Sequence, residues 1–280
     1  MRRRQFLPAL GSGLPALATG LGTSFWMYAV EPHRFSLTRT QIHLPNIRPT
    51  RLLHLSDWHV GDGLKASELA AGLRLALATQ PDLIALTGDF VSTTRAMDHA
   101  GLRDLLRRCA DTAPTFATLG NHDGGRWLAN RGGSPNTDEV RTVIAQTRVR
   151  HLDNQSIQLR GLTLVGLGDL WANDFSPARA FPPTLDPTTP TTPTIVLSHN
   201  PDTKDYLTQH PWHLMLSGHT HGGQGRIPFA PVLWAPVRDR RYISGLYAWQ
   251  GRQLFISRGM GSPLHLRFNC APELSLLELA

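Results

Sequence analysis

Side chains that could bind metal ions gather in five short blocks of this sequence. Each block carries carboxylate, imidazole or amide groups, and each directly follows an apolar run. The blocks are Asp57-Trp58-His59, Gly88-Asp89, Gly120-Asn121-His122-Asp123, Ser198-His199-Asn200 and Gly218-His219-Thr220-His221. These donors together suit Mn²⁺, Fe or Zn²⁺ better than Ca²⁺, and the lack of a nearby thiolate argues against a structural zinc cage. They supply enough ligands for two metal ions and predict a binuclear metallohydrolase.

Asp89 is the natural bridge between two such ions. A carboxylate can hold two cations about 3.5–4 Å apart, and such a pair clamps the attacking and leaving oxygens of an in-line displacement. Phosphate esters need this help because their uncatalysed hydrolysis is among the slowest reactions known. We therefore expect hydrolysis of a phosphodiester or pyrophosphate bond, with two divalent metal ions as cofactors and Mn²⁺ favoured over Fe and Zn²⁺.

Short buried strands are expected to position these blocks. The five apolar runs are short and are bounded by turn or breaker residues, as buried strands should be. They lie at residues 52–56, 83–87, 115–119, 194–197 and 213–217. Because open α/β sheets bind ligands beyond the carboxyl ends of their strands, blocks that follow different strands can converge on one pocket.

Two helical patterns separate the first three of these runs. Residues 65–80 carry a stripe of leucines that ends at Pro81, and residues 98–111 carry a second apolar stripe that includes Cys109. Strands that alternate with helices predict the α/β class, with a parallel sheet covered by helices.

The order of the blocks resembles the calcineurin-like metallophosphoesterase superfamily. Residues 198–202, 216–224, 242–247 and 257–261 resemble its bacterial YkuE/YaeI-type branch, which is related to the chlamydial-type UDP-2,3-diacylglucosamine hydrolases. The similarity covers roughly residues 31–280. It implies a four-layer sandwich in which two mixed sheets are flanked by helices.

The resemblance also implies a role for each residue of the blocks. Three ligands would hold each metal, and Asp89 would bridge the two ions. His122 matches the family histidine that does not bind metal but protonates the leaving oxygen or stabilises phosphoryl charge, and Asp123 would orient it. The first metal would be held by Asp57, His59 and His221, and the second by Asn121, His199 and His219.

Five residues outside the blocks are candidates for binding substrate. Four are arginines, whose planar fork suits phosphate or carboxylate: Arg126, Arg226, Arg258 and Arg267. His265 follows the segment 258–261, which lies near the site in relatives. We expect Arg126, Arg258 and His265 in particular to contact the substrate.

Two loops carry further expectations. The glycine-rich residues 124–136, which include Trp127, directly follow the predicted acid and form either a wall of the pocket or an ordinary surface loop. Residues 181–194 are rich in proline and threonine and predict a stiff, polar surface excursion.

Two other classes of site are disfavoured. Purple acid phosphatases carry a tyrosine three residues after the bridging aspartate, but Ser92 stands there in this chain, so a phenolate–iron site is not expected. A non-catalytic binding module on the same scaffold stays an alternative, although no ligand of the family set is missing.

The amino terminus predicts a targeting segment. Residues 1–7 contain an Arg-Arg-x-Phe-Leu pattern, and an uncharged, apolar run extends from there to residue 30, as in twin-arginine signals. We expect residues 1–30 to be this signal or a membrane anchor, and residues 31–280 to be a single catalytic domain. If the segment spans the membrane with its arginines on the cytoplasmic side, the catalytic domain would lie on the extracytoplasmic side. The alternative is an interfacial helix with the active site at the cytoplasmic face.

The charge balance sets weaker bounds. The formal net charge is +7, but Lys65 and Lys204 are the only lysines, so nearly all of the positive charge is arginine. We expect most of this charge to reflect the codon bias of a GC-rich genome and not a function. No interleaving of aromatic and basic residues indicates nucleic acid as a partner. We expect a monomer that acts on a phosphorylated small molecule or lipid. Of the cysteines, Cys109 is expected to be a buried small hydrophobe, and a disulfide with Cys270 stays open.

Overall fold

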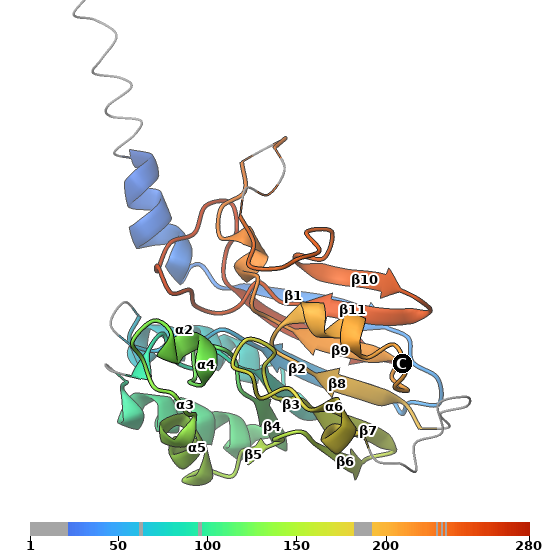
Figure 1. The fold of residues 1–280 in the computed structure, drawn as a ribbon. Coiled ribbons are helices and arrows are strands. Elements are labelled where there is room, and N and C mark those ends of the chain that lie inside the picture. Colours follow the sequence, from blue (N-terminus) through green and yellow to red (C-terminus); the bar gives the residue numbers. More distant parts are fainter. Residues whose placement is uncertain are drawn as a thin grey trace, which may run out of the picture.

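The computed structural model describes residues 22–61, 64–94, 97–181, 192–227, 229–230, 232 and 234–280. Within these residues, twelve strands form two six-stranded sheets (Figure 1). The first sheet has the order β1 (Ser36–Ile42), β12 (Glu273–Leu279), β2 (Thr50–Leu55), β3 (Leu83–Thr87), β4 (Thr115–Thr118) and β5 (Arg150–His151). The second has the order β10 (Gly245–Trp249), β11 (Arg252–Ile256), β9 (Leu214–Ser217), β8 (Thr194–Leu197), β7 (Leu162–Gly166) and β6 (Gln155–Leu159).

Both sheets are mixed, as expected. In the first, β2, β3 and β4 are parallel neighbours and β12 pairs with β2 in antiparallel fashion. In the second, β7, β8, β9 and β11 run parallel, with antiparallel strands at both edges. The five apolar runs become β2, β3, β4, β8 and β9, and four of these five strands are buried at every residue because both of their faces are covered.

One core lies between the two sheets, and helices cover the outer face of the first. The inter-sheet core includes Leu52, Leu83, Leu197, Leu216 and Phe255. The outer helices are α2 (Ala66–Leu77), α3 (His99–Thr112) and α5 (Asp138–Ala145), drawn in green in Figure 1. Their buried apolar residues pack with the outward-facing residues of the first sheet in one cluster, which is the amphipathic arrangement that the helical patterns predicted.

The ends of these helices follow from local side-chain chemistry. The Glu68 carboxylate accepts a hydrogen bond from the Lys65 backbone N–H at 2.7 Å, which satisfies a group at the start of α2. The Asp98 carboxylate accepts one from the Gly101 N–H at 2.9 Å at the start of α3.

The outer face of the second sheet carries a thinner layer. It is covered by the short helix α6 (Pro177–Ala180), the 3₁₀ helix η4 (Pro201–Tyr206) and the large side chains of Phe181, Trp212 and Trp249. Both helices begin with proline and end within six residues. The four-layer expectation therefore holds with an outer layer of helical turns on this side.

The segment that leads into the domain is helical. Residues 22–25 continue into η1 (Trp26–Val30) and the 3₁₀ turn η2 (Glu31–His33), drawn in blue at the top of Figure 1. Residues 1–21, with the paired arginines, lie outside the described residues, as do residues 182–191 of the proline-rich loop. In the part of the chain that the structure describes, no helix has the length and apolar character needed to cross a bilayer.

This segment is tied to the loop that precedes β12. The Met27 carbonyl accepts a hydrogen bond from the Arg267 N–H at 3.0 Å. The Glu31 carboxylate, only 4% exposed, accepts from the backbone N–H groups of Asn269 at 2.9 Å and Cys270 at 2.6 Å. The chain from residue 26 onwards is therefore packed against the domain. Cys270 is free, as is Cys109, and both are buried.

Candidate metal centre

The predicted metal ligands all follow the carboxyl ends of strands and converge from both sheets. Asp57 and His59 follow β2, Asp89 follows β3, and Asn121 follows β4. His199 follows β8, and His219 and His221 follow β9. Two groups of side chains have ligand atoms within 4.8 Å of one another and share Asp89: Asp57, His59, Asp89 and His221 in one, and Asp89, His199 and His219 in the other. These aspartates and histidines lie together as the resemblance implied, and Asn121 stays a predicted ligand beside the second group.

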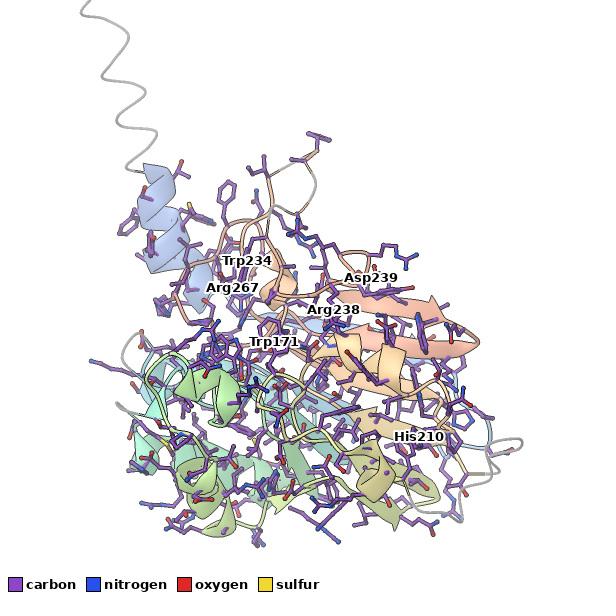
Figure 2. All side chains as sticks on the ribbon, in the orientation of Figure 1. Trp171, His210, Trp234, Arg238, Asp239 and Arg267 are labelled. Carbon is purple, nitrogen blue, oxygen red and sulfur yellow. The ribbon has the colours of Figure 1, made fainter. Side chains whose placement is uncertain are left out.

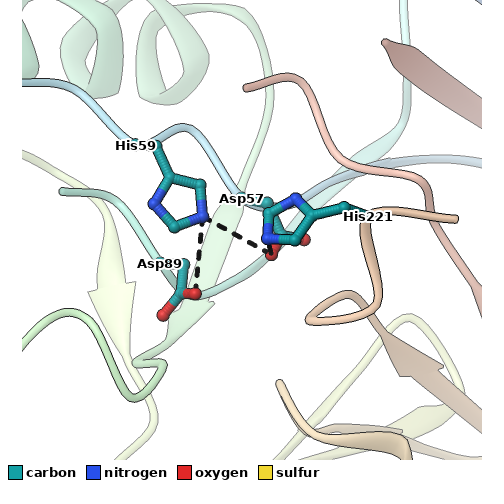
Figure 3. A group of neighbouring side chains, drawn as sticks. All are labelled: Asp57, His59, Asp89 and His221. Atoms are coloured by element: carbon teal, nitrogen blue, oxygen red, sulfur yellow. Dashed lines mark ion pairs between the residues drawn. The ribbon is translucent and has the colours of Figure 1, made fainter. Parts of the chain in front are cut away.

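The first group is drawn in Figure 3. His59 Nε2 lies 3.5 Å from Asp89 Oδ2 and 3.9 Å from Asp57 Oδ1, and His221 Nε2 lies 3.6 Å from the same Asp57 oxygen. All four side chains are almost completely buried. The donors therefore surround a single small space.

The second group meets at the same oxygen of Asp89. His199 Nε2 lies 3.1 Å from Asp89 Oδ2 and 3.1 Å from His219 Nδ1. Asn121 is also buried, and its side chain lines the same cavity as Asp89 and His219. An amide oxygen, two imidazoles and a shared carboxylate are thus available to a second ion.

The unpaired polar atoms show that metal ions fit here. His59 Nε2, Asn121 Oδ1 and His219 Nε2 are buried and have no hydrogen-bond partner among the described residues. Buried polar atoms without partners are rare in proteins, and several in one place indicate a missing ligand. Oxygen and imidazole nitrogen donors suit divalent transition metals. The residues present therefore fit two divalent cations.

Burial also sets the ionisation that ligation requires. Burial lowers the pKa of His219 to about 3 and holds the pKa of His59 well below its usual value, so these rings are neutral and can donate a lone pair. Burial alone would raise the pKa of Asp89, but the adjacent His199 holds it well below the usual range. The bridging carboxylate is therefore charged. Burial raises the pKa of Asp57 to about 6, and a bound cation would favour its ionised form.

Hydrogen bonds behind the ligands fix their orientation. The Nδ1 of His199 faces the Thr87 carbonyl oxygen at 2.7 Å, so this nitrogen donates and Nε2 is left toward Asp89. The His219 backbone N–H lies 3.1 Å from both carboxylate oxygens of Asp57. Such outer contacts hold ligands in the geometry that a metal needs.

Several ligands have a strained backbone. A positive φ is uncommon for residues other than glycine and costs of order 1–3 kcal/mol, so such residues persist only where the surrounding structure imposes them. Here five candidate ligands share it: Asp57 (φ 54°), His59 (52°), Asp89 (53°), His219 (68°) and His221 (50°). The tertiary structure thus stores strain at the place where the ligands meet.

His122 and Asp123 lie beside the ligands, but not in the relation that the resemblance implied. The Asp123 carboxylate is fully buried and accepts hydrogen bonds from the backbone N–H groups of Asp89 (2.9 Å), Gly120 (2.8 Å) and Phe90 (2.8 Å). His122 instead has its Nδ1 2.8 Å from the Ser92 carbonyl oxygen. Asp123 therefore joins the loops after β3 and β4, and a backbone carbonyl orients His122. The expected orienting role of Asp123 is wrong because its oxygens already serve these N–H groups.

A cavity of about 250 Å³ opens onto the ligands. Beyond the ligands themselves, its walls include Trp127, Arg131, Trp171, Trp234 and Pro263. Trp127 and Trp171 are stacked with ring centroids 6.2 Å apart, and the Arg131 guanidinium lies 3.9 Å from the centroid of Trp127. The loop 124–136, with helix α4 (Arg126–Ala129), therefore forms a wall of the pocket, which decides between its two interpretations.

Sequence reasoning missed Trp171, although a signal was present. Residues 168–171 directly follow the apolar strand β7, which is the pattern that identified the other blocks. The buried Asp169 accepts hydrogen bonds from the Trp171 and Ala172 N–H groups at 2.7 and 2.8 Å and fixes this turn. Trp171 then reaches the ring of His219, with centroids 4.4 Å apart. Figure 2 labels it between the two halves of the molecule.

None of the candidate substrate-binding residues lines this cavity. Arg126 lines a neighbouring pocket that shares Trp127 and Trp171. Arg258 forms an ion pair with Glu273 at 3.2 Å, and Arg226 Nε donates to the Gly222 carbonyl at 3.1 Å.

The other two candidates serve the loop before β12. His265 packs against the ring of His33 with centroids 5.1 Å apart. Arg267 is 1% exposed and donates to the carbonyl oxygens of His221 (3.0 Å) and Gly259 (3.3 Å), so it is a structural residue and not a substrate clamp.

Comparisons with known proteins identify the class. Residues 50–223 match the family described as calcineurin-like phosphoesterase, and the chain belongs to this family. It is a metallophosphoesterase, a hydrolase of phosphoric ester bonds.

The similar proteins include members of the expected branch. Phosphodiesterase YaeI of Escherichia coli (strain K12) is 36% identical, with 99% of this chain and 98% of that protein covered. UDP-2,3-diacylglucosamine pyrophosphatase LpxG of Chlamydia muridarum is 28% identical, with 91% and 92% covered. The metallophosphoesterase YkuE of Bacillus subtilis (strain 168) is 28% identical, with 100% and 98% covered. The suspected YkuE/YaeI-type branch is confirmed.

Proposed function

We propose that this enzyme uses two divalent metal ions, with Mn²⁺ favoured, to hydrolyse a phosphodiester or pyrophosphate bond in a lipid-linked substrate such as UDP-2,3-diacylglucosamine. The observation that carries the proposal is the pair of buried ligand groups that share Asp89 and open onto one cavity. The name of the chlamydial relatives supports the substrate class.

The chain's own residues can serve this reaction. Two divalent cations in such a site neutralise phosphoryl charge and lower the pKa of water. Because a carbonyl oxygen only accepts, the Ser92 carbonyl holds the hydrogen of His122 on Nδ1, and Nε2 is left for proton transfer to the leaving oxygen. Arg131 adds a fixed positive charge to the cavity wall, and Trp127 and Trp171 offer flat faces to a base or an apolar group.

Membrane association is supported by a set of exposed apolar side chains, the apolar rim, one of which lines the cavity. We define this apolar rim as Phe25 (67% exposed), Tyr28 (53%), Phe229 (110%), Trp234 (52%) and Leu264 (68%). Trp234 also lines the cavity, and Figure 2 labels it on the same side of the molecule as the entering helix. Large exposed aromatic and aliphatic side chains mark membrane contact sites.

The apolar residues 7–21, preceded by arginines, lead directly into this rim, so we propose a bilayer as its occupant. We propose that the domain lies at the cell membrane or is exported by the twin-arginine route; the cytoplasmic face of the membrane is the competing location.

A broad-specificity phosphodiesterase is the second candidate. It is favoured by the 36% identity to phosphodiesterase YaeI over nearly the whole of both chains.

The deciding experiment compares the full chain with Asp89→Asn, assayed with Mn²⁺ on bis-p-nitrophenyl phosphate and on UDP-2,3-diacylglucosamine in mixed micelles. Loss of the bridging charge should reduce turnover on both substrates at least about 100-fold, since a bridging ligand supports several kcal/mol of charge stabilisation. Circular dichroism should show a retained fold. Replacement of the exposed His43 by alanine is the matched control and should leave turnover unchanged.

Each outcome has a distinct meaning. Full activity of Asp89→Asn would reject the two-metal mechanism. A wild-type chain that is silent on both substrates would favour the binding module, and similar kcat/KM values for the two substrates would favour the broad phosphodiesterase.

A further inference from the structure

A second cluster of metal-ligating side chains lies outside the catalytic centre. His33, Glu68 and His265 have ligand atoms that all lie within 4.8 Å of one another. They come from three segments that are far apart in the sequence: the turn η2, the first turn of α2 and the loop before β12. All three are partly exposed, so an ion in solution can reach them.

The geometry suits a single small cation. His33 Nε2 lies 3.8 Å from Glu68 Oε1, and the rings of His33 and His265 meet edge to face with centroids 5.1 Å apart. Zn²⁺ binds imidazole nitrogen and carboxylate oxygen at about 2.0–2.2 Å, which puts neighbouring ligand atoms roughly 3.4 Å apart in a tetrahedron. Small side-chain rotations would therefore close the cluster around an ion, with a water molecule in the fourth position.

The surroundings already orient these ligands. Glu68 Oε2 accepts the hydrogen bond from the Lys65 N–H at 2.7 Å, and this contact leaves Oε1 toward His33. His265 is held by its N–H, which donates to the Ser262 carbonyl at 3.1 Å, and its φ of 47° is the strained kind found at the catalytic ligands. Burial, and then His33, lower the pKa of His265, so its ring is neutral near pH 7.

The loop that carries His265 also supports the catalytic centre. Pro263 lines the catalytic cavity, and the Gly261 N–H donates to the Asp57 carbonyl at 2.6 Å. Two residues after His265, Arg267 holds the His221 carbonyl by its side chain and the Met27 carbonyl by its backbone. One face of this loop thus contacts the metal ligands and the other contacts the entering helix.

We propose that His33, Glu68 and His265 form a third metal site, for a single Zn²⁺-like divalent cation, which fastens the amino-terminal segment to the loop beside the catalytic cavity. The catalytic ions would be held by other residues, so this site does not depend on the proposed function.

The test counts metal ions on the full chain. After saturation with Zn²⁺ or Co²⁺ and dialysis, the wild-type chain should retain three equivalents by mass spectrometry of the metals. His265→Ala should retain two, and so should Glu68→Gln, in which the amide oxygen can still accept the Lys65 hydrogen bond. The control His43→Ala should retain three. An Asp89→Asn chain should keep an equivalent that is lost when His265→Ala is added, which separates this site from the catalytic one.

Hydrogen exchange gives a second measure. At a free metal concentration 100 times the dissociation constant of this site, linkage predicts about 100-fold slower exchange of the amides in residues 26–34 of the wild-type chain, and no change in His265→Ala. Equal metal counts in the wild-type chain and both variants, or equal exchange rates with and without the third equivalent, would overturn the proposal.

Discussion

At the scale of single residues, the neighbours of a buried histidine separate those that can bind metal from one that serves the core. His54 matches no ligand position of the family and is fully buried. Its Nε2 lies 2.8 Å from Thr87 Oγ1, and its ring packs edge to face on Phe255 with centroids 5.8 Å apart. Among the residues that the structure describes, no carboxylate faces it, so burial lowers the pKa of His54 to about 3 and the ring is neutral in the folded protein.

His54 should therefore make stability fall in acid. The unfolded chain takes up a proton near pH 6.5 and the folded chain only near pH 3, so the contribution is complete above about pH 6.5 and is lost as the pH falls toward 3. One proton corresponds to a slope of about 1.4 kcal/mol per pH unit. We expect urea unfolding of the metal-free chain between pH 4.5 and 6 to show a slope smaller by this amount in His54→Gln than in the wild-type chain.

The other buried histidines are present in both chains, so their contributions to the pH dependence of the unfolding free energy cancel in this comparison. His43→Gln changes an exposed histidine and should keep the wild-type slope. Identical slopes in wild type and His54→Gln would show that His54 is not held neutral.

At the scale of elements, the loops that carry the ligands are packed so closely that only glycine fits between them. A Cβ on Gly120, after β4, would lie 2.2 Å from Asp89 Oδ1, which follows the neighbouring strand β3. A Cβ on Gly218, after β9, would lie 1.9 Å from Ser56 Oγ and 2.1 Å from Asp57 Oδ2, which follow β2 of the other sheet. These glycines let the loop after one strand contact a ligand that follows another strand, within one sheet or across the two.

Gly120→Ala should therefore displace the bridging carboxylate. Because displacements of about 1 Å can cost about 100-fold in rate, we expect a loss of this order in Mn²⁺-dependent hydrolysis of bis-p-nitrophenyl phosphate. Weaker Mn²⁺ binding should accompany it. Gly225→Ala, at a position where nothing lies within 4 Å of the added Cβ, is the matched control. If Gly120→Ala kept wild-type turnover and metal affinity, the close approach of the two loops would not matter for the site.

At the scale of the whole molecule, the apolar rim meets the catalytic cavity at Trp234. This side chain, from the loop after η5 (His221–Gly223), is exposed and lines the cavity, and the exposed Leu264 follows Pro263, which also lines it. A bilayer at this surface would present lipid-linked substrate directly to the cavity mouth.

Removal of two side chains of the apolar rim should lower activity on a lipid substrate but not on a soluble one. Each fully buried Leu or Phe side chain contributes about 1.5–3 kcal/mol, so Phe229→Ser with Leu264→Ser should lower kcat/KM on vesicle-bound UDP-2,3-diacylglucosamine by about 100-fold. Hydrolysis of soluble bis-p-nitrophenyl phosphate should stay unchanged. Leu246→Ser, on the exposed strand β10, is the control and should change neither rate. Equal losses on both substrates, or none on vesicles, would argue against the rim as a membrane contact.

The local features of this protein were determined by the sequence itself. Short apolar runs bounded by breakers predicted β2, β3, β4, β8 and β9, and periodic leucines predicted α2 and α3. These predictions were possible because the spacing of apolar residues within a short stretch of sequence indicates which element can bury them. The metal-ligand types and their division into two groups around Asp89 followed from strand-end blocks and the family resemblance.

Tertiary structure alone decided which side chains meet. β1 pairs with β12 although the two strands lie far apart in the sequence. Trp171, Arg131 and Trp234 reach one cavity from separate loops. Packing also brings together the loops whose four backbone N–H groups donate hydrogen bonds to the Asp123 carboxylate. The contact between the rings of His265 and His33 has the same origin. The physical reason is that strand-end blocks specify the donors locally, whereas distances between donors depend on how the two sheets stack and on the strained turns that this stacking imposes.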